Sequence, residues 1–240
     1  MASDMSKMAI FVEGQTEMIF VEKLLKEIAG YKNIVINTFS MTGGRKTPRI
    51  RALRSSAIDV DARFSVVIVD CGTDNQVVSD ICDQYQDLIR EGYSLIIGIR
   101  DVHPLLRTDI PRFREVIATT FNKLCKGDAQ SLLLLSVMEI ETYFIIEHTH
   151  FLKVDASLTS DRIRNDFGFD PSVDDVELRD KPSEDMRNIY RSVNKGYNKN
   201  KKDIQRVVEN LDYARLYLEL PLRCPSLSDL IRILDDFLAI

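Results

Sequence analysis

Acidic residues follow four separate apolar runs of the sequence. They are Glu13, Asp70, Asp101 and the pair Glu139 and Glu141. An apolar run bounded by turn residues is typical of a buried parallel strand, and ligands of open α/β sheets bind at the carboxyl edge of the strands. Carboxylates gathered there repel one another unless protons or cations compensate them. The pattern therefore predicts a hard divalent cation held by carboxylates, waters and phosphate oxygens.

Two basic segments could contact phosphates. The first contains Arg45, Lys46, Arg49, Arg51 and Arg54, and the second contains Lys195, Lys199, Lys201, Lys202 and Arg206. Each is either ordinary solvated surface or a phosphate-contacting surface beside an acidic centre. The candidate nucleic-acid contacts are Arg45, Lys46, Arg49, Lys199, Lys201 and Lys202. Lys46, or a lysine from 199–202, could offset charge on a scissile phosphate.

The segment 11–17 contains the most specific motif, Phe-Val-Glu-Gly-Gln-Thr-Glu. Gly14 after a strand permits a tight turn and close approach of a ligand. Thr16 could cap the following helix. Glu17 would lie in its first turn, where the helix dipole favours an acid, so Glu17 also has a purely structural interpretation. Glu13 is different, because a charge that closes a buried strand is costly without a partner.

This order of strand, Glu13-Gly14, Thr16-Glu17 and helix resembles the opening of the TOPRIM (topoisomerase–primase) domain. The form it resembles is that of OLD-type nucleases and related small bacterial proteins of defence islands. The resemblance covers most of residues 8–145 and, more loosely, 187–238. It implies a metal-dependent nuclease that acts on DNA or RNA with Mg²⁺ or Mn²⁺, a role in anti-phage defence, and an ATPase protein as a candidate partner.

The resemblance also assigns roles to single residues. Glu13 matches the central acid, as metal ligand or general base; Asp70, Asp101 and Glu141 would complete the cation site, with Glu17 and Glu139 in reserve. The expected catalytic residues are Glu13, Asp101 and Lys46.

The acidic pattern of this superfamily is only partly kept. A later strand usually ends in Asp-x-Asp, but His103 stands in the second position after Asp101. Histidine suits Mn²⁺ or Zn²⁺ and is a poor Mg²⁺ ligand. The alternative is a non-catalytic TOPRIM-like subunit that senses a ligand or binds a partner protein. A phosphotransferase or nucleotide hydrolase would share the metal, but no motif for a base-binding pocket is found.

These residues must be positioned by alternating strands and helices. The patterns predict strands over 8–13, 34–39, 64–70, 94–101 and 131–138, and helices over 16–29, 48–56, 76–90, 111–125 and 141–147. Such alternation indicates a mainly parallel, Rossmann-like sheet flanked by helices. Helices are also predicted over 160–167, 183–195, 200–210 and 226–238. We therefore expect a TOPRIM-like α/β domain over 8–150 and a helical C-terminal extension over 151–240, packed on it.

Composition sets the remaining bounds. Hydrophobic residues make up 45% of the 240 residues, which is enough for a packed core, and the net charge is −5. No apolar stretch is long enough to span a bilayer, so no membrane association is expected. The four cysteines are scattered, which predicts reduced thiols and a cytoplasmic protein. Composition does not predict the oligomeric state.

Overall fold

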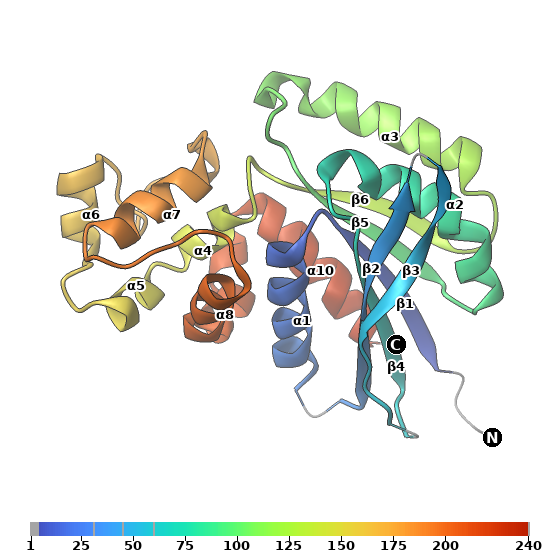
Figure 1. Ribbon diagram of the computed structural model, residues 1–240. Helices are drawn as coiled ribbons and strands as arrows, with labels where there is room; N and C mark the ends of the chain where they lie inside the picture. The colour runs from blue at the N-terminus through green and yellow to red at the C-terminus, as the bar shows by residue number, and fades with distance from the viewer. Residues whose placement is uncertain (1–4, 31, 45, 60, 240) are drawn as a thin grey trace. The chain divides into compact units, whose positions relative to one another are not determined.

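A six-stranded sheet forms the centre of the first half of the chain (Figure 1). The computed structural model describes residues 5–30, 32–44, 46–59 and 61–239. The strands are β1 (Ser6–Val12), β2 (Ile34–Gly44), β3 (Thr47–Ser55), β4 (Phe64–Asp70), β5 (Leu95–Asp101) and β6 (Gln130–Ser136). Their order in the sheet is β3-β2-β4-β1-β5-β6. β1 runs parallel to β4 and β5, and β2 runs parallel to β4, which confirms a mainly parallel sheet.

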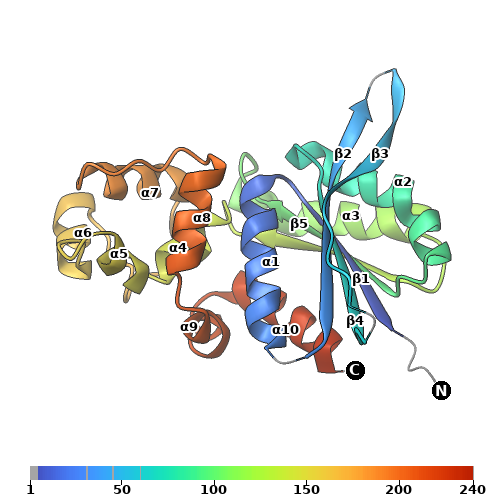
Figure 2. The same cartoon turned by 60° about the horizontal axis from the view of Figure 1, so that its bottom comes forward.

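Helices cover both faces of this sheet. α1 (Gln15–Ala29) lies on one face, and α2 (Val77–Arg90) and α3 (Ile110–Leu124) lie on the other (Figure 2). The central strands are apolar at almost every position, and Met8 to Val12 of β1 are completely buried. Burial on both faces explains why these strands appear in the sequence as continuous apolar runs.

One predicted element is wrong. The sequence predicted a helix over 48–56, but Thr47–Ser55 is the edge strand β3, antiparallel to an extended β2. Gly43 and Gly44 are the last residues of the extended β2. Gly43 has a φ of +101°, and a Cβ there would lie 2.3 Å from the Pro48 carbonyl oxygen. Glycine thus permits close backbone approach, and Pro48 is tolerated because it lies near the start of an edge strand.

The chain divides into two compact units, and neither is one continuous segment. The first comprises residues 1–100, 108–135 and 233–240, and the second comprises 101–107 and 136–232. The predicted boundary between residues 150 and 151 falls inside α5 (Thr149–Val154), within the second unit.

The second unit is helical, in agreement with the loss of strand patterns along the sequence. Its helices are α4 (Glu141–Ile146), α5, α6 (Ser160–Phe167), α7 (Pro182–Arg191), α8 (Lys201–Asn210) and α9 (Tyr213–Leu218), followed by α10 (Pro225–Ala239), whose end belongs to the first unit. Short 3-10 turns lie at Asp74–Gln76, Arg107–Asp109, Val176–Leu178 and Leu220–Leu222. No helix among the described residues is both long and apolar enough to cross a membrane.

Candidate functional site

The order of the strands creates a point at which the connections diverge. From β1 the chain passes through α1 to β2, and from β4 it passes through α2 to β5 on the opposite side. β1 and β4 are neighbours, so their carboxyl ends flank the position at which ligands bind in doubly wound sheets. Val12 lies opposite Asp70 in the register. Glu13 and Asp70 thus occupy the ends of the two strands that define this crevice.

Glu13 is mostly buried and lies near a cation. Its side chain is 15% exposed, and its Oε1 is 3.8 Å from Nε of Arg100, whose side chain is 10% exposed. At this distance the pair attracts electrostatically. Glu17 is buried in the first turn of α1, where the helix dipole favours it. Arg100 is therefore a neighbour that the sequence analysis missed, although it immediately precedes Asp101 in the sequence.

Asp70 is a carboxylate whose ionised form is disfavoured. Burial raises its pKa, although the Gly72 N–H and the charge of Arg54 lower it in part. The Gly72 N–H donates to Asp70 Oδ1 at 2.8 Å, and Gly72 has a φ of +82°. The left-handed backbone thus turns an N–H group back onto the carboxylate. A bound cation would oppose the effect of burial and favour the ionised form.

The other predicted acids belong to the second unit, where a lysine contacts two of them. Lys199 Nζ lies 3.0 Å from Glu141 Oε1 and 3.8 Å from Glu139 Oε1. Burial alone would lower the pKa of Lys199, but Glu141, Glu139 and Asp101 raise it overall. Lys199 is therefore charged at neutral pH and compensates this acidic cluster. The sequence analysis had predicted that Lys199 contacts a nucleic acid.

Two further groups hold these glutamates. The Tyr197 hydroxyl donates to Glu141 Oε1 at 2.6 Å, while Glu141 Oε2 is buried and has no hydrogen-bond partner among the described residues. Glu139 accepts from the N–H and the hydroxyl of Ser183, at 2.7 and 2.9 Å. Ser183 lies in the first turn of α7, so Glu139 caps this helix. Glu139 thus has a structural role at the start of α7.

These acids are candidate ligands of a divalent cation. Across the part of the chain that the structure describes, no group of three or more His, Cys, Asp or Glu side chains could hold a metal ion. Mg²⁺, however, is commonly held by one or two protein carboxylates together with waters and substrate phosphates. The hard oxygen donors of Glu13 and Asp70, at the ends of neighbouring strands, fit a site of that kind. They do not form an all-protein cage.

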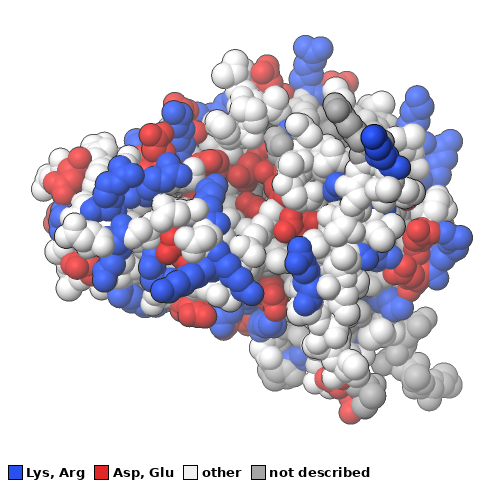
Figure 3. Space-filling view, viewed as in Figure 1, with Lys and Arg blue, Asp and Glu red and all other residues white. Residues whose placement is uncertain are grey.

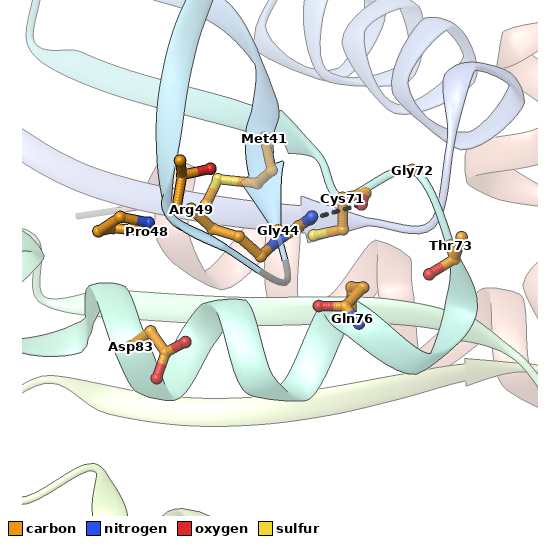
Figure 4. A pocket seen from close by; sticks show the side chains of 10 residues that line it. Met41, Gly44, Pro48, Arg49, Cys71, Gly72, Thr73, Gln76 and Asp83 are labelled. Atoms are coloured by element: carbon orange, nitrogen blue, oxygen red, sulfur yellow. Dashed lines mark hydrogen bonds between the residues drawn. The ribbon is translucent and has the colours of Figure 1, made fainter.

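A cavity of about 650 Å³ lies beside the loop that follows β4 (Figure 4). It is lined by the β2–β3 hairpin on one side and by Cys71, Gly72 and Thr73 on the other. Arg49 crosses it: Nε and Nη2 donate to the buried Asp80 at 2.6 and 2.7 Å, and Nη2 also donates to the Cys71 carbonyl oxygen. Arg49 therefore fastens the hairpin to α2, and any phosphate contact would compete with this bidentate pair.

The remaining basic residues differ in their availability. Lys46 is exposed next to the turn of the hairpin, whereas Arg45 lies outside the described residues. In the second unit, basic side chains gather over α7 and the segment that leads into α8 (Figure 3). Its exposed members are Arg191, Lys195, Lys201 and Lys202. Lys201 and Lys202 lie in the first turn of α8, where the helix dipole disfavours cations. An anion bound there would remove this penalty.

Comparison with known proteins gave no match: no protein-family model, no curated protein and no solved structure matches the chain. The site must therefore be interpreted from its own geometry.

Proposed function

We propose that the chain is a metal-dependent nuclease that hydrolyses phosphodiester bonds in DNA or RNA. One observation carries this proposal: Glu13 and Asp70 end the two neighbouring strands at which the sheet connections diverge. The resemblance of segment 11–17 to the TOPRIM opening points to the same chemistry. A function in anti-phage defence and an ATPase partner follow from that resemblance alone.

The roles of the residues follow from their surroundings. Glu13 and Asp70 would hold Mg²⁺ or Mn²⁺, which supplies Lewis-acid stabilisation of charge at the phosphate. Glu17 is buried in the first turn of α1, where its charge is favoured by the helix dipole. Lys46 is exposed and can contact a phosphate, as can Lys201 and Lys202. Asp101 and Glu141 stay predicted ligands, and Lys199 already offsets part of their charge.

Glu13→Gln tests the proposal. Gln keeps the size and hydrogen bonding of the side chain and removes its charge. We expect cleavage of plasmid, single-stranded DNA or tRNA in Mg²⁺ or Mn²⁺ to fall by at least about 100-fold, as for loss of a central electrostatic group. Divalent cations should raise the melting temperature of the wild type more than that of the variant, because ligand binding stabilises the native state.

Glu115→Gln is the matched control, because Glu115 is exposed on α3 of the same unit. It should retain both cleavage and cation stabilisation. A wild type that neither cleaves any of the three substrates nor gains stability from either cation would contradict the proposal.

One observation favours a non-catalytic alternative. The Lys199 ammonium group already contacts Glu139 and Glu141 in the second unit, where a metal ion would otherwise be expected. A built-in cation can hold an acidic cluster together in a subunit that binds a ligand or partner without cleaving it. Cation stabilisation of the wild type in the absence of cleavage would favour this reading.

A further inference from the structure

Two of the four cysteines form a pair in the first unit. Cys82 lies on α2, and Cys125 follows the last residue of α3. Their Sγ atoms are 3.7 Å apart, with the Cys125 thiol oriented toward Cys82. Both are free thiols and both are partly exposed, whereas Cys71 and Cys224 are buried. Only this pair combines proximity with access from solvent among the described cysteines.

The surrounding contacts hold the two sulfur atoms together. The Gln86 side-chain amide donates to the Lys126 carbonyl oxygen at 3.0 Å, and the Tyr85 hydroxyl donates to the Ala129 carbonyl oxygen at 2.7 Å. Gly127 packs so tightly on α2 that a Cβ there would lie 2.4 Å from the Ile89 side chain. Three successive contacts therefore fasten the segment after α3 to α2, directly beside the thiol pair.

The geometry points to a modification site: we propose that Cys82 and Cys125 form a reversible intramolecular disulfide with a low-molecular-weight disulfide as oxidant. A disulfide has an S–S length of about 2.05 Å, so each sulfur would have to move by less than about 1 Å. Rotation about the side-chain torsions of two partly exposed cysteines can supply a movement of this size. The proposal is independent of the nuclease function.

The reaction balances in two exchange steps. The thiolate of one cysteine attacks the small disulfide, forms a mixed disulfide and releases one small thiolate. The thiolate of the second cysteine then attacks the protein sulfur of that mixed disulfide and releases the second small thiolate. The two protons lost by the cysteines are taken up by the two released thiolates. The protein pair is oxidised by two electrons, and the small disulfide is reduced by two.

The environment makes this exchange slow at neutral pH. Burial, and then the neighbouring Cys125, raise the pKa of Cys82 to about 12, and burial also raises the pKa of Cys125. Because the thiolate is the reactive form, the rate should increase as the pH rises. The acidic side chain of Asp83, next to Cys82, acts in the same direction. The pair is thus suited to slow oxidation rather than to catalysis.

The test uses the full reduced chain incubated with glutathione disulfide between pH 7 and 9. Remaining thiols are alkylated in denaturant, and the peptides are identified by mass spectrometry. We expect one Cys82–Cys125 cross-linked peptide, faster formation at higher pH, and full reversal by dithiothreitol. Cys71 and Cys224 should be alkylated. The cross-linked protein should melt several degrees higher, because the bond restricts the unfolded chain.

Two variants make the result specific. Cys82→Ala should abolish the cross-link and leave Cys125 as a mixed disulfide with glutathione. Cys71→Ala changes a buried thiol outside the pair and should leave the cross-link unchanged. Repeating the oxidation in denaturant should remove the selectivity for this pair. Mixed disulfides alone in the folded wild type, or cross-links that involve Cys71 or Cys224, would overturn the proposal.

Discussion

At the scale of single residues, the role of a buried acid depends on the basic side chain that compensates its charge. The sequence indicated that Glu13, Asp70 and Glu141 close apolar runs, and the structure places all three in buried or half-buried surroundings. The sequence could not indicate which basic side chains lie next to these acids. Arg100 near Glu13, and Lys199 near Glu141, come from other parts of the chain, and such pairs depend on tertiary packing rather than on local spacing. A basic segment can therefore look like a nucleic-acid contact when one of its lysines is an internal ion-pair partner.

The pair of Lys199 and Glu141 gives a prediction on stability. Lys199→Met should lower the free energy of unfolding by about 1–3 kcal/mol, because it leaves the fully buried Glu141 without its cation, while the 34% exposure of Lys199 screens part of the attraction. Adding Glu141→Gln should recover most of this loss, since neither charge is then present. Urea unfolding of both single variants and the double variant completes the cycle. Lys202→Met, at an exposed position, is the control and should have little effect.

The pair of Lys199 and Glu141 also makes the free energy of unfolding depend on pH. Because the folded-state pKa of Lys199 is raised, its stabilisation is fully present below the ordinary lysine pKa of about 10.4. It is lost as the pH rises through the higher folded-state value. The wild type should therefore lose stability in alkali more steeply than Lys199→Met. Equal alkaline slopes for the two proteins, or additive effects in the mutant cycle, would show that the two side chains do not interact.

At the scale of elements, most strands and helices could be predicted and one could not. The apolar runs that became β1, β4 and β5 are continuous because both faces of these strands are buried. The sequence of β3 contains no continuous apolar run. It lies at the edge of the sheet, and most of its side chains are exposed or half-buried, so basic residues and Pro48 are allowed in it. Local patterns therefore could not distinguish this strand from an amphipathic helix.

Gly43 and Gly44 provide a matched test of the hairpin. Gly43→Ala should destabilise it by roughly 1–3 kcal/mol, because the residue has a positive φ and its Cβ would collide with the Pro48 carbonyl oxygen. A Cβ at Gly44 meets nothing within 4 Å, so Gly44→Ala should be nearly neutral. Hydrogen exchange of the β3 amides measures the effect locally. Equal protection of β3 in the two variants would argue against the antiparallel pairing.

At the scale of the whole molecule, sequence order does not follow the division into units. The predicted division placed everything after residue 150 in an extension, because helical patterns cannot show which unit a helix belongs to. The end of α10 instead belongs to the first unit. There Phe237 packs edge-on against Phe64 of β4 with ring centroids 5.5 Å apart, and the Lys32 ammonium donates to the Leu238 carbonyl oxygen at 2.7 Å. The last residues of the chain therefore help to build the sheet domain.

Phe237→Ala tests this organisation. Phe237 is 2% exposed, so its truncation should cost about 3–5 kcal/mol through lost burial and a residual cavity. Because the contact lies within the first unit, amides of β4 should lose protection from hydrogen exchange before amides of α7 do. Leu222→Ala is the control, because it removes a side chain of the second unit that is 89% exposed. It should change neither the free energy of unfolding nor the protection of β4. Loss of protection in α7 with β4 unchanged would instead place residue 237 in a separate C-terminal extension. Protection of β4 thus decides between a sheet domain that ends near residue 150 and one that requires the last turns of α10.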